Sequence, residues 1–115
     1  MNRNFRLTQS TDFKRVRRFG KSYAHPFVVL LVSPTSGERT HIAIIAGQSV
    51  GNAVQRNRAK RLLREAIRPL LSMLKPGWNV ILISRKQILE TKLPEIQISL
   101  QQLFSKANLI TKSDE

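Results

Sequence analysis

The sequence contains no cysteine, which excludes disulfide bonds, thiolate zinc sites and cysteine nucleophiles. Its two histidines, His25 and His41, are too few for a three-histidine zinc site. Acidic residues are scarce as well, with seven Asp and Glu in 115 residues, and only Asp114 and Glu115 are adjacent. A two-metal nuclease needs several carboxylates around ions about 4 Å apart. The composition therefore favours a protein that binds nucleic acid over one that carries out chemistry itself.

Long apolar runs are also missing. No stretch reaches about 18 apolar residues, so the sequence predicts no membrane span. The polar residues 1–10 lack the apolar segment of a signal peptide. Because the absence of cysteine also suits a reducing compartment, we expect a cytoplasmic protein with no membrane partner.

Positive charge is what the sequence has in excess. Lys and Arg number 20, which gives a formal net charge of +13 and an isoelectric point near 11.6. So large an excess on a small body is typical of a protein whose charge a polyanion neutralises. The length predicts one domain over residues 1–115, with loose tails at 1–9 and 110–115, and a hydrophobic content of 41% predicts a packed core.

The spacing of apolar residues predicts an α+β fold with the order α-β-β-β-α-β-α and one four-stranded sheet. Ser10 can cap the first helix, and Gly20 can end it in a left-handed conformation. Pro69 lacks an amide hydrogen, so the middle helix should kink or end near Arg68. An antiparallel meander is the simplest pairing for the first three strands, which are close in sequence. The expected strands cover 21–25, 27–32, 41–46 and 78–83, and the later helices cover 53–68 and a C-terminal stretch that begins near Pro94.

The predicted helix over 53–68 is apolar on one side and basic on the other. It carries six cations and one acid, Glu65, and five of the six cations are arginine, whose planar fork suits phosphate geometry. These like charges repel one another until a partner neutralises them. The pattern predicts phosphate binding, and the alternative is a solvated helix surface. The apolar side holds Ala59, Leu62, Leu63, Ala66, Ile67 and Leu70, and the C-terminal helix has a similar face at Ile96, Leu100, Leu103, Phe104 and Ala107.

A second basic cluster lies on and after the first predicted helix. Cations interleaved with aromatic rings supply the backbone neutralisation and stacking that single-stranded nucleic acid requires. The alternative places Phe13 and Phe19 in the core. We expect His25 and His41 to be structural or surface residues. The cluster consists of Lys14, Arg15, Arg17, Arg18 and Lys21, with Phe13, Phe19 and Tyr23 between them.

The segment from Gly51 to Glu65, which reads GNAVQRNRAKRLLRE, resembles the signature of the protein subunit of bacterial ribonuclease P. That family carries an Arg-Asn-Arg core, here Arg56-Asn57-Arg58, followed by a basic helix. Arg6-Leu7, Asp12-Phe13 and Gly20 resemble the family's N-terminal helix, and the resemblance covers nearly the whole chain.

The resemblance implies a two-layer α/β sandwich like domain 2 of ribosomal protein S5, with a left-handed β-α-β crossover through the Arg-Asn-Arg helix. It also implies two RNA partners, the catalytic RNA of ribonuclease P and the 5′ leader of precursor tRNA. The RNA subunit would hydrolyse the phosphodiester with magnesium and remove the leader. The protein itself would then have no catalytic residue, no metal site and no obligate protein partner.

Two sets of contact residues follow by position. The resemblance places Arg17 in a leader-binding cleft with Phe13 and the exposed side of 27–32, including Leu31, and the second basic cluster adds Lys14 and Tyr23. Three positions depart from the family pattern, at Arg17, Leu30-Leu31 and Gln48-Ser49. The residues expected against the catalytic RNA are Arg56, Asn57, Arg58, Lys60, Arg61 and Arg64, to which the charge pattern adds Arg68.

Two other interpretations compete with this one. The segment 55–61 also resembles the recognition helix of a homeodomain-like DNA reader, but that domain has three helices and no sheet. The β-branched runs 27–32, 41–45 and 80–83 argue against it. The other alternative is a ribosomal-type or RNA-scaffold protein that has no link to cleavage.

Overall fold

The computed structural model describes residues 16, 18, 20–35, 37 and 39–110. Most of the first predicted helix lies outside the described residues, although Val16 and Arg18 are helical. The strands are β1 (Lys21–Ala24), β2 (Val28–Pro34), β3 (His41–Ile45) and β4 (Trp78–Ser84), the α-helices are α2 (Ala53–Ile67) and α3 (Leu93–Lys106), and short 3₁₀ segments occupy η2 (Gln48–Val50), η3 (Arg68–Met73) and η4 (Lys86–Glu90). The element order of the described part agrees with the prediction.

The four strands form one mixed sheet in the order β1-β2-β4-β3. The predicted meander is wrong, because β4 lies between β2 and β3, antiparallel to β2 and parallel to β3. Consecutive apolar residues of β4 point to opposite faces of the sheet, and Val80, Ile81 and Leu82 are all completely buried. A strand that is apolar on both faces is best buried in the centre of the sheet, where β4 lies. Helix α2 connects the parallel neighbours β3 and β4, which gives the β-α-β unit that the family resemblance implies.

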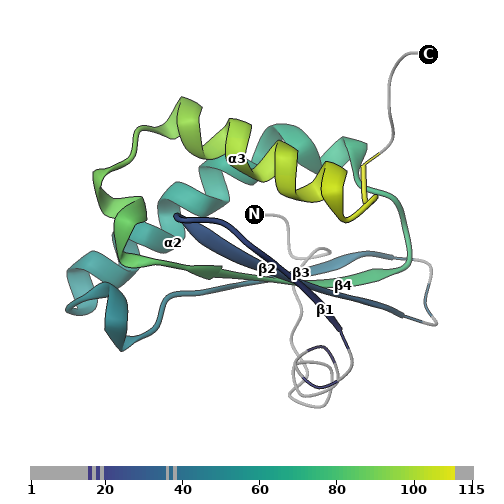
Figure 1. Cartoon of the computed structure of the whole chain (residues 1–115), viewed down its shortest axis with the longest axis horizontal. Helices are drawn as coiled ribbons and strands as arrows, with labels where there is room; N and C mark the ends of the chain where they lie inside the picture. Colours follow the sequence, from purple (N-terminus) through teal and green to yellow (C-terminus); the bar gives the residue numbers. More distant parts are fainter. Residues whose placement is uncertain (1–15, 17, 19, 36, 38, 111–115) are drawn as a thin grey trace.

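The two faces of this sheet have different surroundings. Helices α2 and α3 both pack on one face, which we call the helix face, as Figure 1 shows. Leu30 of β2 is paired with Leu82 of β4, and both belong to the core beneath the helices. Leu31 and Ile81 are paired on the opposite face, which we call the open face, where they pack with Val16. Side chains therefore alternate along each strand between two separate hydrophobic clusters.

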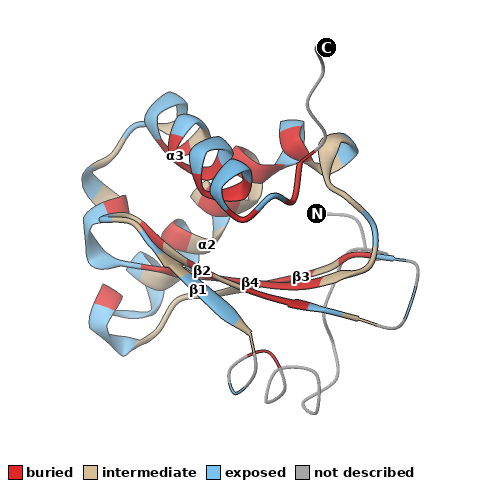
Figure 2. Ribbon diagram, turned by 45° about the vertical axis from the view of Figure 1, so that its right-hand side comes forward, coloured by how far each residue is buried: buried red, intermediate tan, exposed pale blue. Residues whose placement is uncertain are grey.

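The predicted apolar faces of both helices form the core of the helix face. Of the middle helix, Leu62 is half-buried and the other five predicted residues are buried. All five residues predicted for the C-terminal helix are buried, and Phe104 is the largest completely buried side chain of the described residues. Figure 2 shows the buried residues of α2 and α3 turned toward the sheet and the exposed ones turned away.

Both ends of α2 are fixed by local chemistry. At its start, the side chain of Asn52 accepts a hydrogen bond from the backbone N–H of Gln55 at 2.9 Å, and the side chain of Gln55 accepts one from the N–H of Asn52 at 2.8 Å. At its end, the helix stops at Ile67 and the chain continues as 3₁₀ turns through Pro69. The boundary predicted near Arg68 is therefore confirmed.

Two sequence-based expectations about chain ends and turns need correction. Gly20 ends a helical turn, since its N–H donates to the carbonyl of Val16 at 2.9 Å, but its φ is not in the left-handed region. Glycine is needed there because a Cβ would collide with the carbonyl oxygens of Val16 and Val32. Ile110, which belongs to the predicted tail 110–115, is buried and bridges Leu74, and residues 111–115 lie outside the described residues.

Candidate nucleic-acid interface

The seven residues predicted to bind the catalytic RNA lie together on α2 and at its C-cap. We call them the basic face: Arg56, Asn57, Arg58, Lys60, Arg61, Arg64 and Arg68. Four of them, Asn57, Arg58, Arg61 and Arg68, are exposed, and the other three are half-buried. Because the opposite side of α2 is held in the core by Ala59, Leu63 and Ala66, the guanidinium groups are directed away from the sheet.

Little negative charge offsets this surface. Glu65 is the one acidic residue of α2, and its carboxylate pairs with Arg68 at 3.2 Å between Oε2 and Nη2. Both side chains of that pair are well exposed, at 44% and 63%, so the pair contributes little to stability. Within the described residues, the other five cations of α2 have no carboxylate at ion-pair distance. Apart from Arg68, the basic face is therefore an array of unneutralised charge that suits a chain of phosphates.

The predicted leader cleft is only partly described. Phe13, Lys14 and Arg17 lie outside the described residues. Leu31 lies half-buried on the open face, as expected for a cleft residue. Tyr23 does not join it: β1 pairs Tyr23 with Leu30, and both contribute to the core on the helix face. The placement of Tyr23 in that cleft is therefore wrong, because neighbouring residues of a strand point to opposite faces and the register gives Tyr23 the other side.

The open face contains further residues that were not identified from the sequence. Ile83 of β4 and Ile45 of β3 are half-buried around the fully buried Val16, next to Leu31. Val29 is paired with Ile83 and is also half-buried. Side chains alternate between the two faces along 78–84, but assigning Ile83 and Ile45 to this surface requires the strand order, which places β4 beside β2 and β3 beside β4. This face offers an apolar surface on which bases of a single strand can lie.

The two histidines lie at different places in the fold. His41 is half-buried at the start of β3, and His25 lies in the turn between β1 and β2, where its ring packs 4.7 Å from that of Phe27. In the part of the chain that the structure describes, no group of three or more His, Cys, Asp or Glu could hold a metal ion. No helix there is both long and apolar enough to cross a membrane.

Comparison with known proteins identifies the family of this chain. A family model described as Ribonuclease P matches residues 1–108. The chain belongs to the ribonuclease P protein family. It is 39% identical over 109 residues to the ribonuclease P protein component of Herpetosiphon aurantiacus, covering 95% of this chain and 89% of that protein. It is 35% identical over 115 residues to the ribonuclease P protein component of Dehalococcoides mccartyi, covering 100% and 94%.

Solved structures agree with this assignment. The RNase P protein of Staphylococcus aureus superposes with a TM-score of 0.81 at 26% identity, covering 93% of this chain and 98% of that one. The RNase P protein of Thermotoga maritima superposes with a TM-score of 0.77 at 25% identity, covering 88% and 96%. The expected α+β fold is thus confirmed. As a ribonuclease P protein component, the chain has an RNA partner and a tRNA substrate, and it takes part in tRNA processing.

The same findings settle the alternatives. A homeodomain-like DNA reader has no sheet, so the four-stranded sheet shows that this interpretation is wrong. The family match likewise favours a link to ribonuclease P over a scaffold protein that has none. The resemblance between 55–61 and a recognition helix arises because both present asparagine and cations on one exposed helix side.

Proposed function

We propose that the basic face binds the catalytic RNA of ribonuclease P while the open face binds the 5′ leader of precursor tRNA. The observation that carries the proposal is the orientation of α2, which buries its apolar side and presents an unneutralised row of arginines. From Arg56 to Arg64 this row rises about 12 Å along the helix axis, at about 1.5 Å per residue. Such a row spans several phosphates of a folded RNA.

The open face supports the second half of the proposal. It lies on the opposite side of the sheet from α2, so the two RNA contacts do not compete for one surface (Figure 1). Its half-buried residues Leu31, Ile45 and Ile83 offer apolar contact to unpaired bases, whereas a folded RNA helix would present mainly phosphates. The position of Leu31 supports its role in leader binding. Phe13, Lys14 and Arg17 remain part of the proposed cleft.

We assign the hydrolysis to the RNA subunit. A water oxygen attacks the phosphorus at the leader junction, the bond from phosphorus to the leader 3′ oxygen breaks, and that oxygen takes a proton. Magnesium held by the RNA would stabilise the charge that develops on these oxygens. The carboxylates of the described residues are dispersed and do not fit a magnesium site, so we derive no step on the protein. The cysteine-free sequence suits a cytoplasmic location for this reaction.

Reconstitution tests the proposal directly. The purified protein is mixed with ribonuclease P RNA and precursor tRNA at low magnesium, where unscreened repulsion between the two RNAs limits their association. We expect the protein to increase the rate of 5′ processing, because its cations offset that repulsion. The controls are the RNA alone and the protein alone. No gain would favour the RNA-scaffold interpretation, and cleavage by the protein alone would contradict the assignment of the chemistry to RNA.

A further inference from the structure

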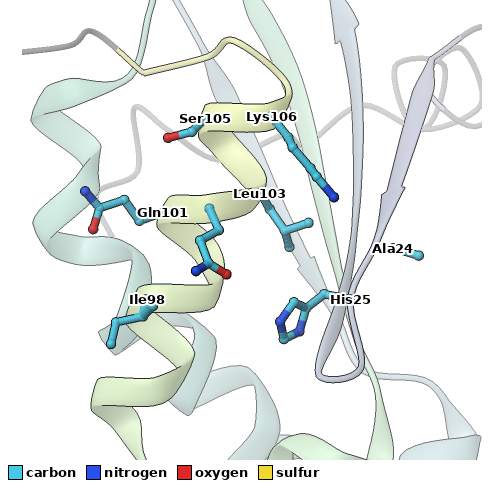
Figure 3. A pocket seen from close by; sticks show the side chains of 8 residues that line it. Ala24, His25, Ile98, Gln101, Leu103, Ser105 and Lys106 are labelled. Atoms are coloured by element: carbon cyan, nitrogen blue, oxygen red, sulfur yellow. The ribbon is translucent and has the colours of Figure 1, made fainter.

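A groove lies between the turn that follows β1 and the outer side of α3 (Figure 3). Its volume of about 710 Å³ is in the range of ligand sites, about 300–1,000 Å³. His25 points from the turn toward α3, and Lys106 reaches toward it from the last turn of that helix. Neither residue belongs to the basic face or to the open face, so the groove is a separate feature of the molecule.

The imidazole of His25 is held as a neutral hydrogen-bond donor. Its Nδ1 accepts a hydrogen bond from the backbone N–H of Phe27 at 3.2 Å, which leaves the ring proton on Nε2. Burial lowers the pKa of His25 below its ordinary value of 6.5, and the positive charges of Lys106 and Arg85 lower it further. The ring therefore presents one N–H and an aromatic face without a charge of its own.

The other lining groups offer hydrogen bonds and apolar contact. Gln101, Gln102 and Ser105 are exposed side chains that both donate and accept hydrogen bonds. Ile98 is 57% exposed and can provide apolar contact for a base, whereas Leu103 is almost completely buried. The lining contains no acidic residue, and its charged group is the ammonium of Lys106. A nucleotide whose base contacts these polar groups and whose phosphate lies near Lys106 would use the hydrogen-bonding and charged groups of this lining.

The groove adjoins β1, the edge strand beside β2 of the open face. Ala24 lines the groove, and β1 pairs Ala24 with Val29, which lies on the open face. A strand of RNA that crosses the open face toward the β1–β2 turn would reach the groove at Ala24. We propose that the groove binds an unpaired nucleotide of the precursor tRNA leader, farther from the cleavage site than the nucleotides on the open face. This inference rests on the proposed leader binding by the open face.

Leader length provides the test. The dissociation constant of the reconstituted holoenzyme is measured for precursor tRNAs with leaders of about 4 and about 16 nucleotides, the range of single-strand site sizes. The groove variant combines Gln102→Ala with Lys106→Ala. The matched control combines Gln87→Ala with Lys92→Ala, which removes the same side-chain types from exposed positions outside the groove. All four residues are exposed, so both variants should fold like the wild type.

We expect the groove variant to bind the long-leader substrate about three- to tenfold more weakly, as the loss of one or two hydrogen bonds predicts. Binding of the short-leader substrate and both affinities of the control variant should stay unchanged. Equal weakening at both lengths, or none, would overturn the groove proposal while leaving processing intact. A holoenzyme whose processing does not depend on the protein would instead contradict the proposed function.

Cross-linking distinguishes the RNA that occupies the groove. Photoreactive thiouridine is placed either along the long leader or in unpaired regions of the catalytic RNA, and the cross-linked peptide is identified by mass spectrometry. We expect a distal leader position to cross-link to a peptide from α3. Cross-links from the catalytic RNA to α3, without any from the leader, would overturn the proposal and assign the groove to the catalytic RNA.

Discussion

The helix face of the sheet is covered by α2 and α3, whereas Val16 is the one described residue outside the sheet that packs in the open-face cluster. The same strands supply both faces, because their side chains alternate. On the helix face the core residues of β2 and β4 are fully or almost fully buried, but on the open face Leu31, Ile45 and Ile83 remain half-buried. The open face also contains the buried Ile81 and Ala43, so it differs from the helix face by its half-buried apolar residues, which a ligand can contact.

Adjacent leucines of β2 test this difference most strongly. Leu30→Ala removes a completely buried side chain beneath the helices and should lower the free energy of unfolding by about 2–5 kcal/mol. Leu31→Ala removes a half-buried side chain and should cost clearly less stability, while it weakens discrimination between precursor and mature tRNA. Urea denaturation and binding of both tRNAs provide the measurements. Equal losses of stability would show that the open face is part of the structural core.

The second prediction concerns the basic face, which lies beyond the covered side of the sheet. Replacing both Arg58 and Arg61 by Ala should weaken binding of the catalytic RNA by about a hundredfold or more, as expected for the loss of two charge-assisted hydrogen bonds. The slope of log affinity against log salt should flatten by roughly 0.7–0.9 for each lost phosphate contact. Titrations at several salt concentrations measure both quantities.

A control separates local contact from overall charge. Arg39→Ala with Lys92→Ala removes two exposed cations from outside α2 and gives the same change in net charge. We expect the affinity and the salt slope of this control to stay close to those of the wild type. If both double variants lose affinity equally, net charge and not the row of arginines on α2 drives binding.

Much of the helix face could be predicted from sequence because its signals are local. The spacing of Leu63, Ala66 and Ile67 identifies the buried side of α2, and Pro69 marks its end. The open face depends instead on which strands are neighbours and in which register. Nothing local in 41–45 indicates pairing with β4, since the covering of β4 on both faces decides that order.

The misplacement of Tyr23 has the same origin. The amino-acid pattern of β1 allows Tyr23 to face either side, because this edge strand is short and its other residues, Lys21, Ser22 and Ala24, are all exposed. The pairing of Tyr23 with Leu30 decides the question, and a shift by one residue would reverse it. The candidate RNA-binding residues of the basic face are thus readable from sequence, whereas those on the sheet require the register.

The smallest expected effect concerns the turn at the edge between the two faces. The pKa of His25 is lowered in the folded protein by burial and by Lys106 and Arg85, so below about pH 6.5 the unfolded chain binds more protons than the folded one. The free energy of unfolding should therefore fall as the pH drops from 6.5 and level off below the folded-state pKa. Protonation would also break the hydrogen bond from Phe27 N–H to Nδ1.

Denaturation between pH 7 and pH 5 measures this fall in the free energy of unfolding, which His25→Gln should remove and His41→Gln should preserve. If the fall persists in His25→Gln, another group is responsible, and the neutral donor inferred for the groove loses its support.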